Sequence, residues 1–245
     1  MDAHDIQSGL TKEYFWFKAK NELIRILMTL SISKNPTTEI NNTLKPERLK
    51  ILNVGVGTGD DLEILQAFGN NYIIDTNVEV LEKINANYIE KKQADVCSLP
   101  YADNFFDIVV ASDVLEHVEN DQQAIAEIYR VLKKNGTLIF TIPAFQFLYS
   151  QHDKTLQHKR RYNSYQLKKL LLKFSKTKIF YWNSLLFIPL VFFRLLTKKI
   201  KTSRHKMLPS FLNKILYKLL SIDNLMIKHN FSLPIGLSII GYGKK

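Results

Sequence analysis

The sequence predicts an α/β fold with one mostly parallel sheet and helices on both of its faces. Short apolar runs of strand length alternate with segments of helical periodicity, which is the order that repeated strand-helix units produce. The first apolar run, Ile51–Val54, leads into Gly55, Gly57 and Gly59. Glycines lack Cβ atoms, so backbone N–H groups can approach a bound molecule where a strand turns into a helix. We therefore expect a ligand at this turn.

The next elements follow from the same periodicity and from the residues that interrupt it. Residues 106–111 have the β-branched composition of a buried strand. Residues 122–132 are amphipathic, and the Lys133-Lys134-Asn135-Gly136 run after them is typical of a helix end. In chain order we expect strands at 51–54, 71–74, 92–95, 106–111 and 137–142, with helices at 61–68, 78–86 and 122–132.

The last third of the chain departs from this alternation. Residues 144–162 are polar and aromatic and contain histidines, and we expect a long loop there. Residues 165–174 have a helical pattern with a lysine-rich face, and 178–182 have the composition of a sixth strand. An insertion rich in Leu, Phe and Lys follows at 183–231, and 232–241 would be the last strand.

Charge is distributed unevenly along the 245 residues. The formal net charge is +11 at pH 7, yet residues 1–150 hold 14 Lys and Arg against 21 Asp and Glu, whereas residues 151–245 hold 20 against 2. A strongly basic half indicates an anionic partner, such as a lipid headgroup, an acidic or phosphorylated substrate, or nucleic acid. Lysines that serve only solubility are the alternative.

The cysteine content and the first residues indicate the cellular compartment in which the protein is expected. Cys97 is the single cysteine, so an intramolecular disulfide and a thiolate metal cluster are excluded. The start, Met1-Asp-Ala-His-Asp5, lacks the charged and apolar regions of a secretion signal. We therefore expect a cytoplasmic protein.

An uncharged stretch of 15 residues, 179–193, lies between basic residues. Crossing a bilayer takes about 20 apolar residues, so this stretch is too short to span one. The basic residues directly after it are Lys198, Lys199, Lys201, Arg204 and Lys206. An apolar helix beside such a run is typical of a helix that lies on the anionic inner face of a membrane. A helix that packs on the sheet or caps a pocket is the alternative.

Carboxylates follow several of the expected strands. Asp60 and Asp61 stand at the helix start where a dinucleotide-binding turn would hold a pyrophosphate, and they would repel that anion. Asp75, Asp95 and Asp113 follow the second, third and fourth strands. Ligands of open parallel sheets bind at the carboxyl ends of the strands. This acidic edge therefore favours a neutral or cationic nucleoside, such as an adenosyl sulfonium.

These residues resemble class I S-adenosylmethionine-dependent methyltransferases of the small-molecule type. The similarity covers residues 48–143 and includes the run 51–61 and the run Asp113-Val-Leu-Glu-His117. It implies a Rossmann-like seven-stranded sheet whose last strand is antiparallel, and S-adenosyl-L-methionine as the cofactor. The cofactor contacts that it implies are Asn53, Gly55, Gly57, Gly59, Asp75, Thr76, Asp95, Val96 and Asp113. Asn53 stands where many members have Asp.

Two further segments resemble methyltransferases that bacteria encode beside surface-glycan genes. The first starts at Tyr14 and includes Trp16 and Lys20, and the second comprises 150–153 and 158–162. The aromatic residues of the first would form a lid over the cofactor, and a helix buried on the sheet is the alternative. Lys20 stands where the resemblance leads us to expect an arginine, and a lysine makes no bidentate contact with a carboxylate.

The segment 144–162 leaves the fifth strand at the cofactor edge and is the expected substrate loop. The candidate general bases are His117, His152 and His158. The candidate substrate-binding residues are Tyr14, Trp16, Asp153, Arg160, Arg161 and Tyr162. The alternatives are a solvated basic loop and, for His117, a histidine with a core role.

The sequence thus predicts an enzyme that transfers a methyl group, with an oxygen of a small molecule, sugar or lipid-linked glycan as the favoured acceptor. A sulfonium is already activated, so no metal ion is expected. Nucleic acid is the less favoured partner, and the oligomeric state is left open. The alternatives are an RNA methyltransferase that uses the basic C-terminal third and a non-catalytic partner protein with this fold.

A single domain is expected over residues 1–245. Its expected parts are an N-terminal helical lid (1–47), a cofactor-binding core (48–143), a substrate loop and helix (144–182), a basic apolar helical insertion (183–231) and the last strand (232–245).

Overall fold

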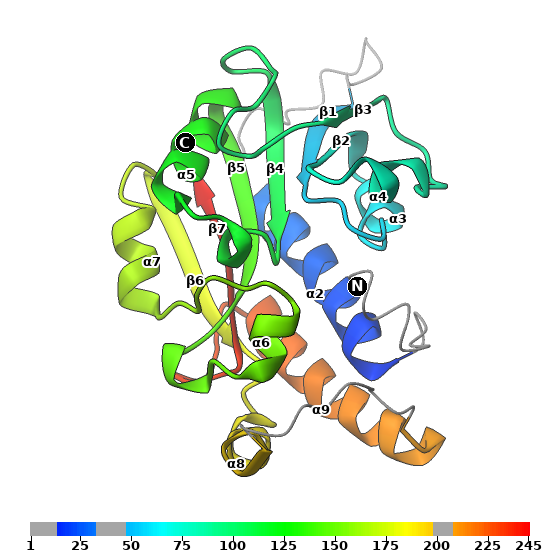
Figure 1. The fold of residues 1–245 in the computed structure, drawn as a ribbon, viewed down its shortest axis with the longest axis vertical. Helices are drawn as coiled ribbons and strands as arrows, with labels where there is room; N and C mark the ends of the chain where they lie inside the picture. The colour runs from blue at the N-terminus through cyan, green and yellow to red at the C-terminus, as the bar shows by residue number, and fades with distance from the viewer. Residues whose placement is uncertain (1–13, 33–47, 198–207) are drawn as a thin grey trace.

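The computed structural model describes residues 14–32, 48–197 and 208–245. One seven-stranded sheet lies between helices on both faces (Figure 1). The strands are β1 (Leu49–Val54), β2 (Gly69–Asp75), β3 (Glu90–Gln93), β4 (Phe106–Ser112), β5 (Leu132–Pro143), β6 (Lys176–Trp182) and β7 (Ser238–Lys244). Their order is β3-β2-β1-β4-β5-β7-β6. The predicted seven-stranded α/β sheet is confirmed.

Strand pairing brings the carboxyl ends of the parallel strands to one edge. β1 pairs in parallel with β2 and β4, β2 with β3, and β4 with β5. Val54, at the end of β1, lies opposite Ile74 and Ala111 of the neighbouring strands. β7 enters between β5 and β6 and is antiparallel to both. The direction of the last strand agrees with the prediction.

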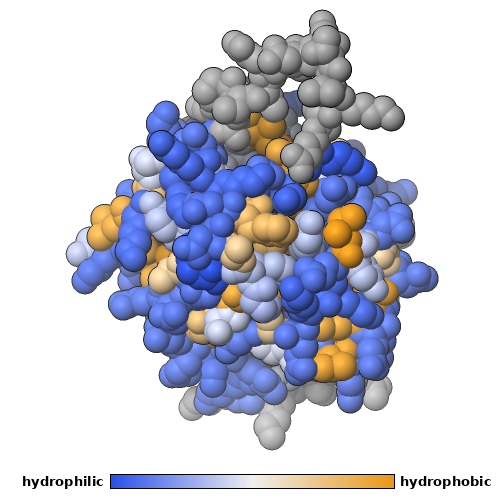
Figure 2. All heavy atoms as spheres, turned by 90° about the horizontal axis from the view of Figure 1, so that it is seen from above, coloured by the Kyte–Doolittle hydropathy of each residue, from blue (hydrophilic) through white to orange (hydrophobic). Residues whose placement is uncertain are grey.

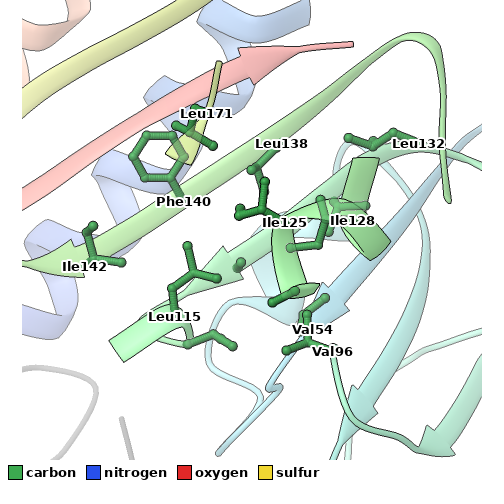
Figure 3. Close-up of a cluster of buried hydrophobic side chains, with 14 of the residues drawn as sticks. Val54, Val96, Leu115, Ile125, Ile128, Leu132, Leu138, Phe140, Ile142 and Leu171 are labelled. Atoms are coloured by element: carbon green, nitrogen blue, oxygen red, sulfur yellow. The ribbon is translucent and has the colours of Figure 1, made fainter. Parts of the chain in front are cut away.

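The helices divide between the two faces of the sheet. They are α2 (Phe15–Ile32), α3 (Leu62–Leu65), α4 (Val78–Glu82), α5 (Asp121–Val131), α6 (Gln151–Thr155), α7 (Ser164–Leu170), α8 (Phe187–Thr197) and α9 (Ser210–Lys228), with 3-10 turns η1 (Leu115–His117) and η2 (Gln146–Leu148). Apolar residues of α5 and α7 pack on one face, and those of α2, α3 and α9 pack on the other. In Figure 3, Ile125 and Ile128 of α5 lie close to Leu138 of β5.

Both faces are buried because the central strands are apolar on each side. Leu52 of β1 belongs to the core under α5, whereas its neighbour Ile51 belongs to the core under α2 and α9. The buried side of α2 recurs every three or four residues, as helical geometry requires. Lys20 lies on that buried side, so a lysine is directed toward the sheet.

Several details of the secondary structure differ from the prediction. Residues 133–136 are predicted to end the preceding helix outside any strand, but they are part of β5. The strand starts directly after α5, because Leu132 pairs with Phe106 of β4. The last strand begins at Ser238 and not at residue 232. The preceding Pro234 has no N–H to donate, and a side chain at Gly236 would collide with the Trp182 carbonyl oxygen.

The segment 144–162 is also more regular than the predicted loop, since it contains η2 and α6. Ser150 and Asp153 cap α6 reciprocally. The helices predicted at 61–68 and 78–86 are present in shorter form as α3 and α4.

The predicted helical insertion contains α8 and α9, and its basic run 198–206 lies outside the described residues. No helix in the described ranges combines the length and apolarity needed to cross a bilayer. The face seen from above in Figure 2 is mainly hydrophilic, with small separate hydrophobic patches.

Buried polar groups join α9 to its neighbours. The Asn224 side chain accepts from the Trp182 indole N–H at 2.9 Å and donates to the Ala19 carbonyl at 2.9 Å, so it connects α9 with β6 and α2. Asp223, which is 1% exposed, accepts from the Ser184 N–H at 2.7 Å. These contacts fix the two long helices on one face of the sheet.

We expect Asn224→Leu to lower the free energy of unfolding by about 1–3 kcal/mol, because it leaves the buried Trp182 N–H without a partner. Urea denaturation followed by tryptophan fluorescence measures this change. Ser221→Ala is the matched control on the same helix, because the Ser221 hydroxyl donates to the Tyr217 carbonyl of its own helix. Equal midpoints for the two variants would contradict the role given to Asn224.

Candidate functional site

The sheet reverses its winding at β1 and β4, which are neighbours although β2 and β3 come between them in sequence. In open α/β sheets the crevice at such a reversal, outside the carboxyl ends of the strands, is where ligands bind. The glycine turn follows β1, and Asp113 follows β4. The structure thus brings these two predicted segments together at the reversal point, below β1 and β4 in Figure 1.

The glycine turn has a backbone that other residues rarely adopt. Gly55, Gly57 and Gly59 have φ angles of 63°, 52° and 75°. A Cβ at Gly55 would lie 2.8 Å from Val114 Cγ2, and one at Gly59 would lie 2.8 Å from Ile84 Cδ1. The positive φ angles favour glycine at all three positions, and space is also short at Gly55 and Gly59, so the turn presents backbone rather than side chains.

Asp75 is tied to the glycine turn by its carboxylate. Oδ2 accepts from the Gly57 N–H at 3.1 Å, and Oδ1 accepts from the Asn77 N–H at 2.9 Å. A carboxylate has about four acceptor positions, so each oxygen retains capacity for a hydroxyl donor. Thr76 is exposed beside it. The position fits recognition of a diol.

The other predicted cofactor contacts are divided between the surface and the interior. Asp95 is exposed, and its Oδ1 accepts from the Cys97 N–H at 2.8 Å. Val96 is buried in the core beside β1. Asn53 of β1 is 1% exposed, and its Nδ2 has no partner among the residues that the structure describes. A buried amide donor without an acceptor is unusual, and a polar ligand would satisfy it.

Lys20 and Asp113 form an ion pair at the reversal point. Lys20 Nζ lies 2.5 Å from Asp113 Oδ2, and the Thr141 hydroxyl donates to Asp113 Oδ1 at 2.8 Å. Burial alone would lower the pKa of Lys20, but the carboxylates of Asp113, Asp61 and Glu116 outweigh it and raise that pKa. Burial likewise opposes ionisation of Asp113, but Lys20 and Thr141 hold its pKa below the usual value. Both groups are charged at neutral pH.

Glu116 lies three residues further on, in η1, and is fully buried. Neither carboxylate oxygen has a hydrogen-bond partner in the described part of the chain. Burial and the nearby Asp113 raise the pKa of Glu116 well above its ordinary value. Its backbone oxygen accepts from the Lys159 N–H at 2.7 Å, which holds the predicted substrate loop beside it.

Asp153 organises the predicted substrate loop from inside. It is fully buried and receives hydrogen bonds from Arg161 Nε at 2.7 Å and from the Ser150 N–H at 2.9 Å. Its Oδ1 also lies 3.0 Å from His158 Nδ1. Burial alone would raise the pKa of Asp153, but His158 and Arg161 hold it well below the usual range. Arg161 is 4% exposed, so its guanidinium is directed inward and pairs with the buried Asp153 carboxylate.

Arg160 and Tyr162 contact α5 and the segment before it. Arg160 Nη1 lies 3.3 Å from Asp121 Oδ2, and its Nη2 donates to the Glu119 carbonyl at 2.7 Å. The Tyr162 hydroxyl donates to the same Asp121 carboxylate at 2.9 Å. Burial and Asp121 raise the pKa of Tyr162. These contacts position the loop.

The structure brings two of the three candidate bases together. The rings of His117 and His158 are 4.7 Å apart between centroids and nearly perpendicular. His117 is exposed and follows β4, whereas His158 is partly buried in the loop. His152 lies on α6 and is partly buried.

Tyr14 and Trp16 lie at the start of α2, partly buried. The Trp16 ring lies 6.0 Å from that of Trp182, between ring centroids, and Lys20 Nζ lies 5.0 Å from the centroid of the Trp16 ring. The predicted lid is therefore also in contact with the sheet.

Sequence reasoning did not include Lys20, Glu116 and Thr141 among the site residues. The sequence did contain an indication that Lys20 belongs to the site, since it occupies the position of an expected arginine. Glu116 had one as well, because it lies between Asp113 and His117 after β4. Thr141 lies within an apolar strand, and nothing in its sequence context indicates a role.

We expect Lys20→Met to lower the free energy of unfolding at pH 7 by about 1–3 kcal/mol, because it leaves Asp113 partly buried without a cation. The stability that ionised Asp113 contributes is present above its unfolded pKa of about 3.9, and it is lost as pH falls through the lower folded pKa. Denaturation midpoints from pH 7 to pH 3 measure both effects. The exposed Lys18→Met, on the same helix, should change little, and identical acid profiles for both variants would refute the assignment.

Comparison with known proteins agrees with this geometry. Residues 52–140 match the sequence profile of a family described as a methyltransferase domain. An uncharacterised protein of Methanocaldococcus jannaschii is 31% identical over 147 residues, which cover 58% of this chain and 60% of that protein. The ubiquinone/menaquinone biosynthesis C-methyltransferase UbiE of Blochmanniella pennsylvanica is 32% identical over 123 residues, 42% of this chain and 46% of that protein. The chain thus spans about half the length of these relatives.

A solved structure supports the fold over nearly the whole chain. The S-adenosylmethionine-dependent methyltransferase of Archaeoglobus fulgidus has a TM-score of 0.55 at 20% identity, and the match covers 94% of this chain and 99% of that one. The match of residues 52–140, the shared fold and the acidic edge at the reversal point lead to one conclusion. Residues 52–140 match a methyltransferase domain, and the chain has the fold of an S-adenosylmethionine-dependent methyltransferase.

Proposed function

We propose that the protein transfers the methyl group of S-adenosylmethionine to an oxygen of a small molecule, sugar or lipid-linked glycan. The observation that carries the proposal is Asp75, whose carboxylate is fixed by the glycine turn at the end of β2. A carboxylate held there accepts the two hydroxyls of a ribose, and no phosphate is needed in the ligand. The sequence match of residues 52–140 supports the same cofactor.

The cofactor would extend along the carboxyl edge from β3 to β4. Asp75 and Thr76 would hold the ribose, and Asp95 with Val96 would hold the adenine. The glycine turn and Asn53 would contact the methionine end, and the unpartnered Asn53 amide supports this placement. Lys20, held by Asp113, would approach the cofactor carboxylate as a single cation.

The acceptor would lie between the sulfonium and the segment 144–162. Hydrogen bonds hold this segment in place through four side chains, those of Asp153, Arg160, Arg161 and Tyr162. Tyr14 and Trp16 would cover the acceptor from the start of α2. His117, His152 or His158 would take the proton of the acceptor hydroxyl. Oxygen then attacks the methyl carbon in line with the leaving sulfur, and S-adenosylhomocysteine leaves. Positioning of the two reactants supplies most of the rate.

Methylation at carbon is a second candidate, because the name of the Blochmanniella relative states a C-methyltransferase. Transfer from 13C-methyl-labelled cofactor separates the two, since an O-methyl carbon resonates far from a C-methyl carbon in NMR. The acceptor is found by incubating the protein with labelled cofactor and the polar-metabolite, membrane or RNA fraction of its host. Label in RNA alone would refute the proposed acceptor class.

We expect Asp75→Ala to weaken binding of S-adenosylmethionine about 10- to 100-fold, because hydrogen bonds to a charged group contribute about 1.5–3 kcal/mol. Isothermal titration calorimetry measures the change. Asp103→Ala is the control, since Asp103 is 69% exposed and paired with Arg130. Unchanged affinity in Asp75→Ala, with the fold intact by circular dichroism, would remove the basis of the proposal.

A lipid-linked acceptor also predicts contact with an anionic membrane. Exposed apolar side chains occur along α8 and α9 and in the segment after them, namely Ile188, Phe192, Phe211, Ile215, Ile222, Leu225, Phe231 and Ile235. The part of the chain that bears them has 20 basic residues against 2 acidic ones. Apolar and cationic groups together favour an anionic bilayer surface.

We expect Ile188→Asp to reduce co-sedimentation with vesicles that contain anionic lipid, because α8 would then place a carboxylate at the bilayer surface. Leu172→Asp is a close match, since Leu172 is 76% exposed and Ile188 is 74% exposed, and Leu172 lies just beyond α7. It should sediment as the unaltered protein does. Equal sedimentation of both variants, or none of the unaltered protein, would contradict membrane contact.

A further inference from the structure

We propose that Glu116, His117 and His158 bind a divalent transition-metal ion at the carboxyl edge of the sheet. One ligand atom from each residue lies within 4.8 Å of the other two. Two imidazole nitrogens and one carboxylate oxygen form a ligand set that suits Zn²⁺ and other first-row divalent ions. The inference rests on the proposed function only for what the ion would do, because the site itself follows from the three side chains.

Glu116 supplies the independent observation that points to a ligand. Its side chain is fully buried, and both carboxylate oxygens lack a partner among the described residues. A buried carboxylate without donors is costly, so such groups in proteins are normally paired or bound to a metal. Its backbone is already committed, since the Glu116 carbonyl accepts the Lys159 N–H at 2.7 Å. That contact places the neighbouring His158 beside the carboxylate.

His158 is oriented as a metal-ligating histidine. Its Nδ1 lies 3.0 Å from Asp153 Oδ1, which leaves Nε2 as the nitrogen for an ion. A ligating histidine usually donates its other ring N–H to a carboxylate in this way, and the partner fixes both tautomer and ring direction. Asp153 is itself held by Arg161 and Ser150. The outer support of the site is therefore complete in the protein alone.

The remaining adjustment is small. Ligand atoms around a tetrahedral ion are about 3.4 Å apart, as follows from bond lengths of about 2.1 Å. The three atoms here lie within 4.8 Å of one another, so each pair needs to approach by at most about 1.4 Å. His117 is exposed, so its side chain can rotate without disturbing the core. Three protein ligands leave a fourth position open, which is the arrangement of catalytic rather than structural sites.

The open position gives the ion a part in methyl transfer. Glu116 and His117 directly follow the β4 turn that bears Asp113, so the ion would lie next to the cofactor edge. An acceptor hydroxyl that binds the ion loses its proton to solvent more readily, because the cation lowers its pKa. The resulting oxygen anion then takes the methyl group. His117 and His158 would serve as ligands, the hydroxyl proton would pass to His152 or to water, and the S–CH3 bond would break to release S-adenosylhomocysteine.

The test is metal binding by the full-length, untagged protein after removal of metal with a chelator. Co²⁺ is the probe, because its visible absorption reports coordination geometry, and calorimetry gives stoichiometry and affinity. We expect about one Co²⁺ per chain and a tetrahedral or five-coordinate spectrum, with Zn²⁺ displacing it. His117→Ala and Glu116→Gln should each weaken binding at least about tenfold. His117 is exposed and glutamine is close in shape to glutamate, so both variants should fold.

His229→Ala is the control, because His229 lies at the end of α9, outside the cluster. It should bind Co²⁺ as the unaltered protein does. The site is refuted if the protein binds no Co²⁺, or if Glu116→Gln and His117→Ala bind it with unchanged affinity. S-adenosylmethionine binding by the metal-free protein is measured separately. Metal binding without methyl transfer would uphold the site and refute the proposed function. Methyl transfer without metal binding would uphold the proposed function and refute the site.

Discussion

The ion pair between Lys20 and Asp113 joins the N-terminal helix to the carboxyl edge of the sheet, and much of the site depends on it. Asp113 has a φ angle of 53°, a conformation that non-glycine residues seldom adopt, and it keeps that conformation between Lys20 and Thr141. Val114, the next residue, packs against Gly55 of the glycine turn, and the Glu116 carbonyl in η1 accepts the Lys159 N–H of the loop. This partly buried ion pair therefore holds the residue at which the chain leaves β4 for the cofactor edge.

The fold was predictable wherever local composition and sheet geometry agree. The central strands were found because their apolar runs are buried on both faces, and Asp75 and Asp113 were found because strand ends converge at one edge. The start of β7 was missed, since it depends on a distant strand pair and on glycines that pack against other strands. Residues 133–136 have helix-ending composition, but pairing of Leu132 with Phe106 extends β5 over them.

The site was less predictable because its contacts link residues that are far apart in sequence. Lys20 and Asp113 are separated by 93 positions, and no local pattern marks either as the partner of the other. In the segment 144–162 the residue types were predicted, but sequence could not show that Arg161 turns inward to Asp153. An arginine and an aspartate eight positions apart can face solvent or each other, and burial decides between these states.

The two acidic residues of the basic C-terminal part are Asp153 and Asp223, and both are almost completely buried. The described surface of residues 151–192 and 208–245 therefore has cationic side chains and no side-chain carboxylate. Charge of one sign at one part of a molecule, with net negative charge in the rest of the sequence, gives it a large electric dipole moment. In low salt such a dipole turns the molecule before contact, so that its basic part meets a negatively charged surface first.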